Sequence, residues 1–172
     1  MENKKLKVAI VMGSDSDFPT LKGCIKLLKD FGIEYKVMVC SAHRTPDAAA
    51  NFSKNAEADG YGVIIAAAGK AAHLPGVLAA YTPLPVIGVP IKSSTLDGLD
   101  SLFSIVQMPS GIPVATVAID GGQNAAILAI QILAVGDKEL RKKMKEYKQN
   151  MVIKVEEKNQ ALQEILVKEG LL

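Results

Sequence analysis

Residues 7–19 read KVAIVMGSDSDFP and contain a strand, a loop and the start of a helix in direct succession. Lys7–Met12 is almost entirely apolar, which is typical of a strand that a sheet buries on both faces. The loop that follows contains Gly and Ser, and Asp17 with Pro19 forms a cap-and-proline helix start. The stretch therefore predicts the first βα unit of a parallel sheet.

The same alternation of short apolar runs and longer amphipathic segments continues along the chain. The further expected strands are 34–40, 62–67, 85–89 and 113–119, and the expected helices are 17–32, 45–60, 74–81, 98–107 and 123–135. Glu34–Cys40 is more polar at its start, which suits a sheet edge. Repeated βα units imply right-handed crossovers, so we expect an α/β fold with a flavodoxin-like doubly wound parallel sheet of order 2-1-3-4-5.

The last stretch, from Asp137 to about Glu169, is rich in charged residues and predicts a long C-terminal helical arm. Its apolar residues recur at helical spacing and form one stripe: Leu140, Met144, Tyr147, Met151 and Val155. Such a helix either folds back on its own domain or packs on a neighbouring subunit. We favour the second, because the preceding helix, Gln123–Val135, is apolar nearly all round and should be buried on every side.

Length and composition limit the possible classes of protein. The 172 residues suit a single α/β domain, with 1–136 forming the sheet and its helices and 137–172 the arm. A net charge of +2, 5% aromatic residues and no Trp argue against a nucleic-acid partner. A hydrophobic content of 49% and a mean hydropathy of +0.21 indicate surface buried between subunits.

The two cysteines, Cys24 and Cys40, form neither a disulfide framework nor a four-ligand zinc site, so we expect reduced thiols and no metal. The first residues lack the apolar region of a signal peptide, and no uncharged apolar run reaches the roughly 18 residues of a membrane span. We therefore expect a soluble cytoplasmic protein with no membrane partner.

Chemistry-bearing residues collect in the loops after the first three strands, at 13–17, 41–47 and 68–76. A doubly wound sheet binds ligands at the carboxyl ends of its strands, where the strand order reverses, so these loops should meet there. They contain both histidines of the chain and Arg44, one of two arginines.

Each loop suggests a different contact with a ligand. The first suits an anion or a sugar phosphate, although it is neither a Walker loop nor a dinucleotide fingerprint; Asp17 serves either as a helix cap or as an acceptor for ribose hydroxyls. In the second, Ser41 and Arg44 suit a phosphate or carboxylate, and His43 is either an acid/base or a structural histidine. In the third, His73 either acts as a second acid/base or, as we favour, holds the loop by hydrogen bonds.

With these loops in view, the sequence resembles the PurE family of purine biosynthesis. The matching motifs are collinear and cover nearly all of the first 135 residues: VMGSDSD (11–17), SAHRTPD (41–47), AAHLPG (71–76), LPVIGVP (84–90), LDSLFSIVQMPSGIPVATVAI (99–119) and NAAILAIQIL (124–133). The resemblance is to the bacterial branch, in which a carboxylate migrates from N5 to C4 of an aminoimidazole ribonucleotide.

The resemblance implies that the protein needs no cofactor, neither metal, nucleotide nor biotin. It implies that His43 is the acid/base, that Ser14, Asp17, Ser41 and Arg44 hold the ribose phosphate, and that Ala68 and Gly69 line the base and carboxylate end. Ser16, His73 and Leu74 complete the expected substrate-binding residues. The family also implies a homo-octamer whose C-terminal helices reach across subunits.

Two segments depart from the family pattern. Lys70 stands where many members have a small residue, usually Gly; a cation there would bind the migrating carboxylate or point to solvent, and we favour solvent. The segment Asp120–Gln123 is shorter and differently composed than usual before the apolar helix.

Two alternative functions stay open at the level of sequence. One is the sibling reaction, direct carboxylation of aminoimidazole ribonucleotide by CO2. The other is a non-catalytic flavodoxin-like module that binds a phosphorylated ligand such as a flavin nucleotide, although the scarcity of aromatic residues near the three loops argues against a flavin.

Overall fold

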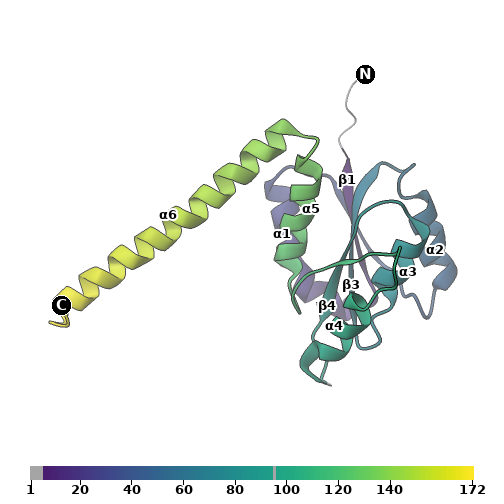
Figure 1. Ribbon diagram of the computed structural model, residues 1–172, viewed down its shortest axis with the longest axis horizontal. Helices are drawn as coiled ribbons and strands as arrows, with labels where there is room; N and C mark the ends of the chain where they lie inside the picture. Colours follow the sequence, from purple (N-terminus) through teal and green to yellow (C-terminus); the bar gives the residue numbers. More distant parts are fainter. Residues whose placement is uncertain (1–5, 95) are drawn as a thin grey trace. The chain divides into compact units, whose positions relative to one another are not determined.

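A five-stranded parallel sheet with strand order β2-β1-β3-β4-β5 organises the first of two compact units, the one that ends at Leu133 (Figure 1). The computed structural model describes residues 6–94 and 96–172. The strands are β1 (Lys7–Met12), β2 (Tyr35–Val39), β3 (Tyr61–Gly69), β4 (Val86–Ile91) and β5 (Ala115–Thr116). All four pairings are parallel, so the expected doubly wound order is confirmed.

Helices cover both faces of the sheet. They are α1 (Phe18–Asp30), α2 (Pro46–Asn55), α3 (Leu74–Tyr81), α4 (Leu99–Val106) and α5 (Gly122–Ala134). Figure 1 shows α1 and α5 beside each other on one face, and α2 and α3 on the other. A Cβ added at Gly88 of β4 would meet both Ile105 of α4 and Pro75 of α3, which places α4 on the α3 side.

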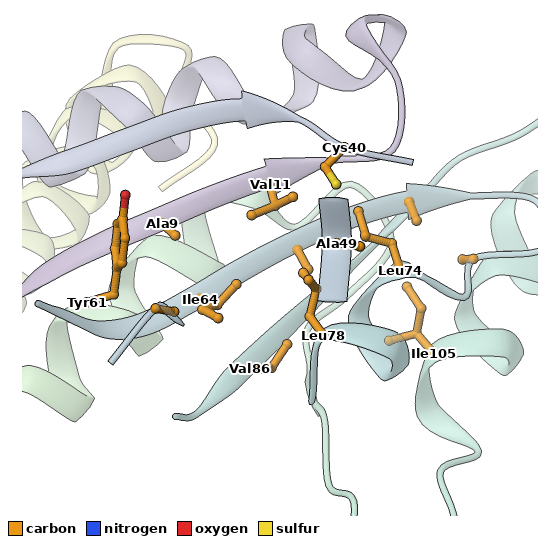
Figure 2. Packing of buried hydrophobic residues seen from close by; sticks show 14 residues of the cluster. Ala9, Val11, Cys40, Ala49, Tyr61, Ile64, Leu74, Leu78, Val86 and Ile105 are labelled. Carbon is orange, nitrogen blue, oxygen red and sulfur yellow. The ribbon is translucent and has the colours of Figure 1, made fainter. Parts of the chain in front are cut away.

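The hydrophobic core on the α2–α4 side is built from alternate strand residues (Figure 2). Ala9 and Val11 of β1 and Ile64 of β3 contribute to this cluster, together with Leu78 of α3. Their chain neighbours of opposite orientation, such as Ile10, are also fully buried. Burial on both faces explains why the central strands read as nearly continuous apolar runs.

The largest differences from the expected bounds are at β5 and α2, which are both shorter by five residues or more. β5 contains only Ala115–Thr116, because Pro113 has no backbone N–H to donate and Asp120 turns the chain with a φ of 56°. Helix α2 ends at Asn55, and residues 56–60 form turns instead of a further helical segment. Gly60 has a φ of 84°, a left-handed conformation that stops the helix from continuing.

Helix α5 is not buried on every side, so this expectation is wrong for the single chain. Its buried side chains include Ala125, Ala126, Ala129 and Ile130, whereas Ile127, Leu128 and Ile132 are only partly covered. The buried side is rich in alanine, which allows close packing beside α1. A Cβ built on Gly23 of α1 would lie 2.8 Å from the Gln123 side chain, so the two helices approach closely there.

The second unit, Ala134–Leu172, consists mainly of α6 (Lys138–Lys168), as expected for the C-terminal arm. The Asp137 carboxylate accepts a hydrogen bond of 2.9 Å from the Leu140 N–H and caps the helix N-terminus. The Arg141 guanidinium donates to the carbonyls of Ala134 and Val135. The turn before the helix is therefore held by the side chains of both Asp137 and Arg141. Among the described residues, no helix has the length and apolar character needed to cross a membrane.

The contact of α5 with α1 generates a stability prediction for Gly122→Ala. A Cβ at this position would lie 2.5 Å from the Thr20 carbonyl oxygen, so the backbone of one helix has to move. We expect a loss of about 1–3 kcal/mol in the free energy of unfolding, measured by urea denaturation. Gly136→Ala is the control, because its Cβ would meet nothing within 4 Å. Equal stability of the two variants would contradict the close contact.

Candidate active site

A cavity of about 670 Å³ lies at the carboxyl ends of the strands, where the loops after β1, β2 and β3 meet. This is the place that the strand order predicts, beside the reversal of direction between β1 and β3. The structure brings all the predicted site residues to the lining of this one cavity: Ser14, Ser16, Asp17, Ser41, His43, Arg44, Ala68, Gly69, His73 and Leu74.

The loop after β1 is held in shape by its own polar groups. Ser14 caps the short 3-10 turn Asp15–Asp17, because its hydroxyl accepts from the Ser16 N–H at 3.3 Å. The Ser16 hydroxyl lies 2.9 Å from the Ser14 hydroxyl. Two hydroxyls therefore stand together at the cavity wall, beside the N-terminus of α1, where an anion is favoured.

Asp17 makes no side-chain hydrogen bond that caps α1, so the helix-cap role is wrong for that helix. Its Oδ2 accepts a hydrogen bond of 3.2 Å from the Ser14 N–H and so closes a capping box around the preceding turn. The side chain is only 6% exposed and also lines the cavity. Burial raises the pKa of the Asp17 carboxyl above its usual value, while hydrogen bonds from Ser14 and Ser16 oppose this rise.

The loop after β2 is closed by Thr45 and carries Arg44 into the cavity. The Thr45 hydroxyl donates to the Ser41 carbonyl at 2.9 Å and accepts from the Ser41 N–H at 3.1 Å. Arg44 donates from Nε to the Ser41 hydroxyl at 3.4 Å and from Nη2 to the Gly13 carbonyl at 3.3 Å. The guanidinium therefore bridges the second loop to the first and lines the cavity.

His43 and His73 form a direct contact between the second and third loops. Nε2 of His43 lies 2.7 Å from Nδ1 of His73, and the rings meet edge to face with an interplanar angle of 81°. One of these nitrogens donates and the other accepts, and the tautomers of the two rings determine which is the donor. His73 thus makes the hydrogen bond that the favoured interpretation of the sequence expected, and its partner is His43.

The sequence interpretation missed the loop after β4, which contributes Ile91, Lys92 and Ser93 to the cavity. In the sheet, Ile91 pairs with Gly69 at the end of β3, so Lys92 follows β4 where Lys70 follows β3. The expected strand order could have predicted this contribution. In the order 2-1-3-4-5, β4 lies next to β3, so the loop after β4 begins at the same edge of the sheet as the loop after β3.

The cavity carries more positive than negative groups. Arg44, Lys70 and Lys92 line it, while Asp17 is the acidic residue of the lining. Among the described residues, none that lines it is a Phe, Tyr or Trp on which a flavin ring would stack. Within residues 6–94 and 96–172, no group of three or more His, Cys, Asp or Glu side chains is placed to hold a metal ion.

Fold and site together define a doubly wound α/β protein with a cavity rich in positive groups at the reversal of its strand order. The chain belongs to the AIR carboxylase family, because the family model of that description matches residues 7–154. This confirms the resemblance that the loop motifs indicate.

Relatives of known name match nearly the whole chain. A Thermotoga maritima protein named N5-carboxyaminoimidazole ribonucleotide mutase is 58% identical over 165 residues, which is 96% of each chain. The crystal structure of Treponema denticola PurE matches with a TM-score of 0.82 and 35% identity over 90% of this chain and 97% of that one. A Candida albicans protein named phosphoribosylaminoimidazole carboxylase is 54% identical over 158 residues, 92% of this chain but only 28% of its own length.

Proposed function

We propose that this protein is an isomerase of purine biosynthesis that converts N5-carboxyaminoimidazole ribonucleotide into 4-carboxyaminoimidazole ribonucleotide. The observation that carries the proposal is the convergence of the two histidines, Arg44 and the Gly/Ala-rich end of β3 on one cavity. The full-length match to a relative named as this mutase supports the same reaction.

The phosphate end of the substrate is assigned to the first two loops. Arg44 already donates to the Ser41 hydroxyl and the Gly13 carbonyl, and its remaining N–H groups form a planar fork suited to phosphate oxygens. The hydroxyls of Ser14, Ser16 and Ser41 stand around the same end of the cavity. Binding energy from this remote group positions the ring for reaction without taking part in the bond changes.

The ribose is assigned to Asp17. One of its carboxylate oxygens is engaged by the Ser14 N–H, which fixes the orientation of the side chain. A carboxylate oxygen accepts two hydrogen bonds or more, so Asp17 still has acceptor capacity for ribose hydroxyls. The phosphate is better placed at Arg44, because a carboxylate against it would repel it.

The carboxylated N5 of the substrate is a carbamate, which loses CO2 once its nitrogen is protonated. We assign this proton transfer to His43, because an imidazole can both give and take a proton. The N5–carboxylate bond breaks as the proton arrives at N5, and the freed aminoimidazole is nucleophilic at C4. C4 then bonds to the same CO2, and His43 takes up the proton that C4 loses, so no atoms are gained or lost.

The wall of the cavity at the end of β3 suits the released CO2. Ala68, Gly69, Ala71 and Leu74 line it with small or apolar groups, which offer water few hydrogen bonds. A site closed to water favours return of CO2 to the ring over its escape. His73 contributes by holding His43, as their 2.7 Å contact indicates, and is a positioning residue.

Direct carboxylation of aminoimidazole ribonucleotide is the second candidate, and the Candida albicans relative named as a carboxylase favours it. The same cavity would hold that nucleotide, with CO2 entering from solution. The chain spans only 28% of that relative, whereas it spans 96% of the Thermotoga maritima mutase. We therefore place the mutase reaction first.

We further propose that the protein assembles as a homo-octamer. Helix α4 presents Leu99, Phe103 and Val106 at helical spacing, each at least 45% exposed in the single chain. Within the second unit, the stripe of α6 continues in exposed Met151, Val155, Leu162 and Ile165. Packing on another subunit would cover both stripes and remove their apolar surface from water.

We place the enzyme in the cytoplasm. Cys24 and Cys40 are both free and buried, as thiols are in a reducing compartment. Burial raises the pKa of the Cys24 thiol to about 12, so this thiol stays protonated and unreactive. Purine synthesis from small phosphorylated precursors is consistent with this location.

The acid/base role is tested by His43→Asn. Asparagine keeps a hydrogen-bonding side chain but transfers no proton, so turnover of N5-carboxyaminoimidazole ribonucleotide should fall at least ~100-fold with little change in nucleotide binding. His73→Asn is the comparison: it removes the partner of His43 without removing the proton donor, and should cost less. Near-normal turnover in His43→Asn would contradict the assignment.

The assembly is tested by paired substitutions on α6. Leu162→Glu with Ile165→Glu places charge on the apolar stripe, and Gln160→Glu with Gln163→Glu adds the same charge to exposed positions off that stripe. Light scattering should give the control the mass of about eight 18.3 kDa chains, while the stripe variant should form smaller particles. An unchanged mass for the stripe variant would show that the stripe is not an interface.

A further inference from the structure

Two lysines stand side by side in the register of the sheet at one end of the cavity. Gly69 of β3 pairs with Ile91 of β4, and the next residues along each strand are Lys70 and Lys92. Both lysines line the cavity. Arg44 reaches the cavity from the loop after β2 and donates to Gly13 after β1, on the opposite side of the sheet order.

The backbone at Lys70 is in a conformation that favours glycine. Its φ is 55°, in the left-handed region where the Cβ of an L-residue crowds the following carbonyl. The surrounding loop consists of small residues, Gly69, Ala71 and Ala72. A lysine is therefore a costlier choice than glycine at this point, which makes its side chain a candidate for a role in the site.

The two lysines differ in how their charge is compensated. Lys92 forms an ion pair with Asp97 at 3.2 Å, and its N–H donates to the Asp120 carboxylate at 3.0 Å, so acidic groups already face the β4 loop. Within the part of the chain that the structure describes, the Lys70 ammonium has no acidic partner within ion-pair distance. At this end of the cavity, the Lys70 ammonium is therefore the positive group that is available to a ligand.

We propose that Lys70 is the counterion for the carboxylate of the substrate and makes the site selective for carboxylated nucleotides. This rests on the proposed function, whose substrate and product each carry a phosphate and a carboxylate. Arg44 with the serine hydroxyls binds the phosphate at one end, and the second anionic group reaches the β3 end, where Lys70 stands. The ammonium is a compact, flexible donor that follows the carboxylate as it moves from N5 to C4.

If Lys70 contacts the carboxylate, it affects the binding of two nucleotides differently, whereas a lysine that only faces solvent does not. Lys70 should contribute to the binding of carboxylated nucleotides and hardly to that of aminoimidazole ribonucleotide, which carries only the phosphate. The difference between the two affinities therefore isolates the contact with the carboxylate from any general effect of charge on binding.

The test measures dissociation constants of 4-carboxyaminoimidazole ribonucleotide and aminoimidazole ribonucleotide by calorimetry at fixed ionic strength. Lys70→Gln keeps the strained backbone and a polar side chain one atom shorter, but removes the charge. It should weaken binding of the carboxylated nucleotide about tenfold, while binding of aminoimidazole ribonucleotide changes less than about twofold. Lys70→Arg keeps the charge and should retain most of the affinity. Lys26→Gln, an exposed lysine of α1 away from the cavity, is the matched control and should change neither.

Two results would overturn the inference while leaving the proposed function intact. The first is that Lys70→Gln binds the carboxylated nucleotide as tightly as the wild type does. The second is that this variant loses affinity for both nucleotides equally. Failure of the proposed function gives a different pattern, because the unmodified protein would then neither bind nor interconvert the carboxylated nucleotides, and the role of Lys70 would fall with it. The KM for N5-carboxyaminoimidazole ribonucleotide should rise in Lys70→Gln more than kcat falls.

Discussion

Parallel pairing of β1 with both β2 and β3 is the constraint on which the rest of this structure depends. Because hydrogen bonds align these strands in one direction, their carboxyl ends meet at one edge of the sheet. The loops after them carry little regular structure and are free to hold polar groups. Arg44 bonds across to the Gly13 carbonyl, and His43 bonds across to His73, so the loops are joined to one another as well as to the sheet. A rigid sheet thus positions side chains that lie far apart in the sequence.

Much of this arrangement is predictable from the sequence, because it follows from local patterns. The apolar run Lys7–Met12 and the helix Leu74–Tyr81 have the bounds that their patterns predict. The convergence of the predicted site residues also follows, since the strand order determines which loops meet. These predictions needed only the periodicity of apolar residues and the rule for parallel sheets.

Other features could not be predicted from the sequence, because they depend on contacts between distant segments. The short β5 reflects a missing donor at Pro113 and a positive φ at Asp120. The positive φ could not be predicted from the sequence, because only a small fraction of non-glycine residues adopt one. The contact between His43 and His73 joins residues from two loops, and only the folded sheet sets their separation. The partial exposure of α5 shows that an apolar helix need not be covered by its own chain.

In the proposed mechanism, a single CO2 leaves N5 and returns to C4 without escaping from the cavity. The most direct measurement starts from N5-carboxyaminoimidazole ribonucleotide labelled with 13C in its carbamate carboxylate, in buffer rich in unlabelled bicarbonate. Mass spectrometry of the product should find most of the label retained, and aminoimidazole ribonucleotide with bicarbonate should react poorly under the same conditions. Loss of the label to the buffer, together with efficient reaction of aminoimidazole ribonucleotide and bicarbonate, would contradict the mutase mechanism and establish direct carboxylation instead.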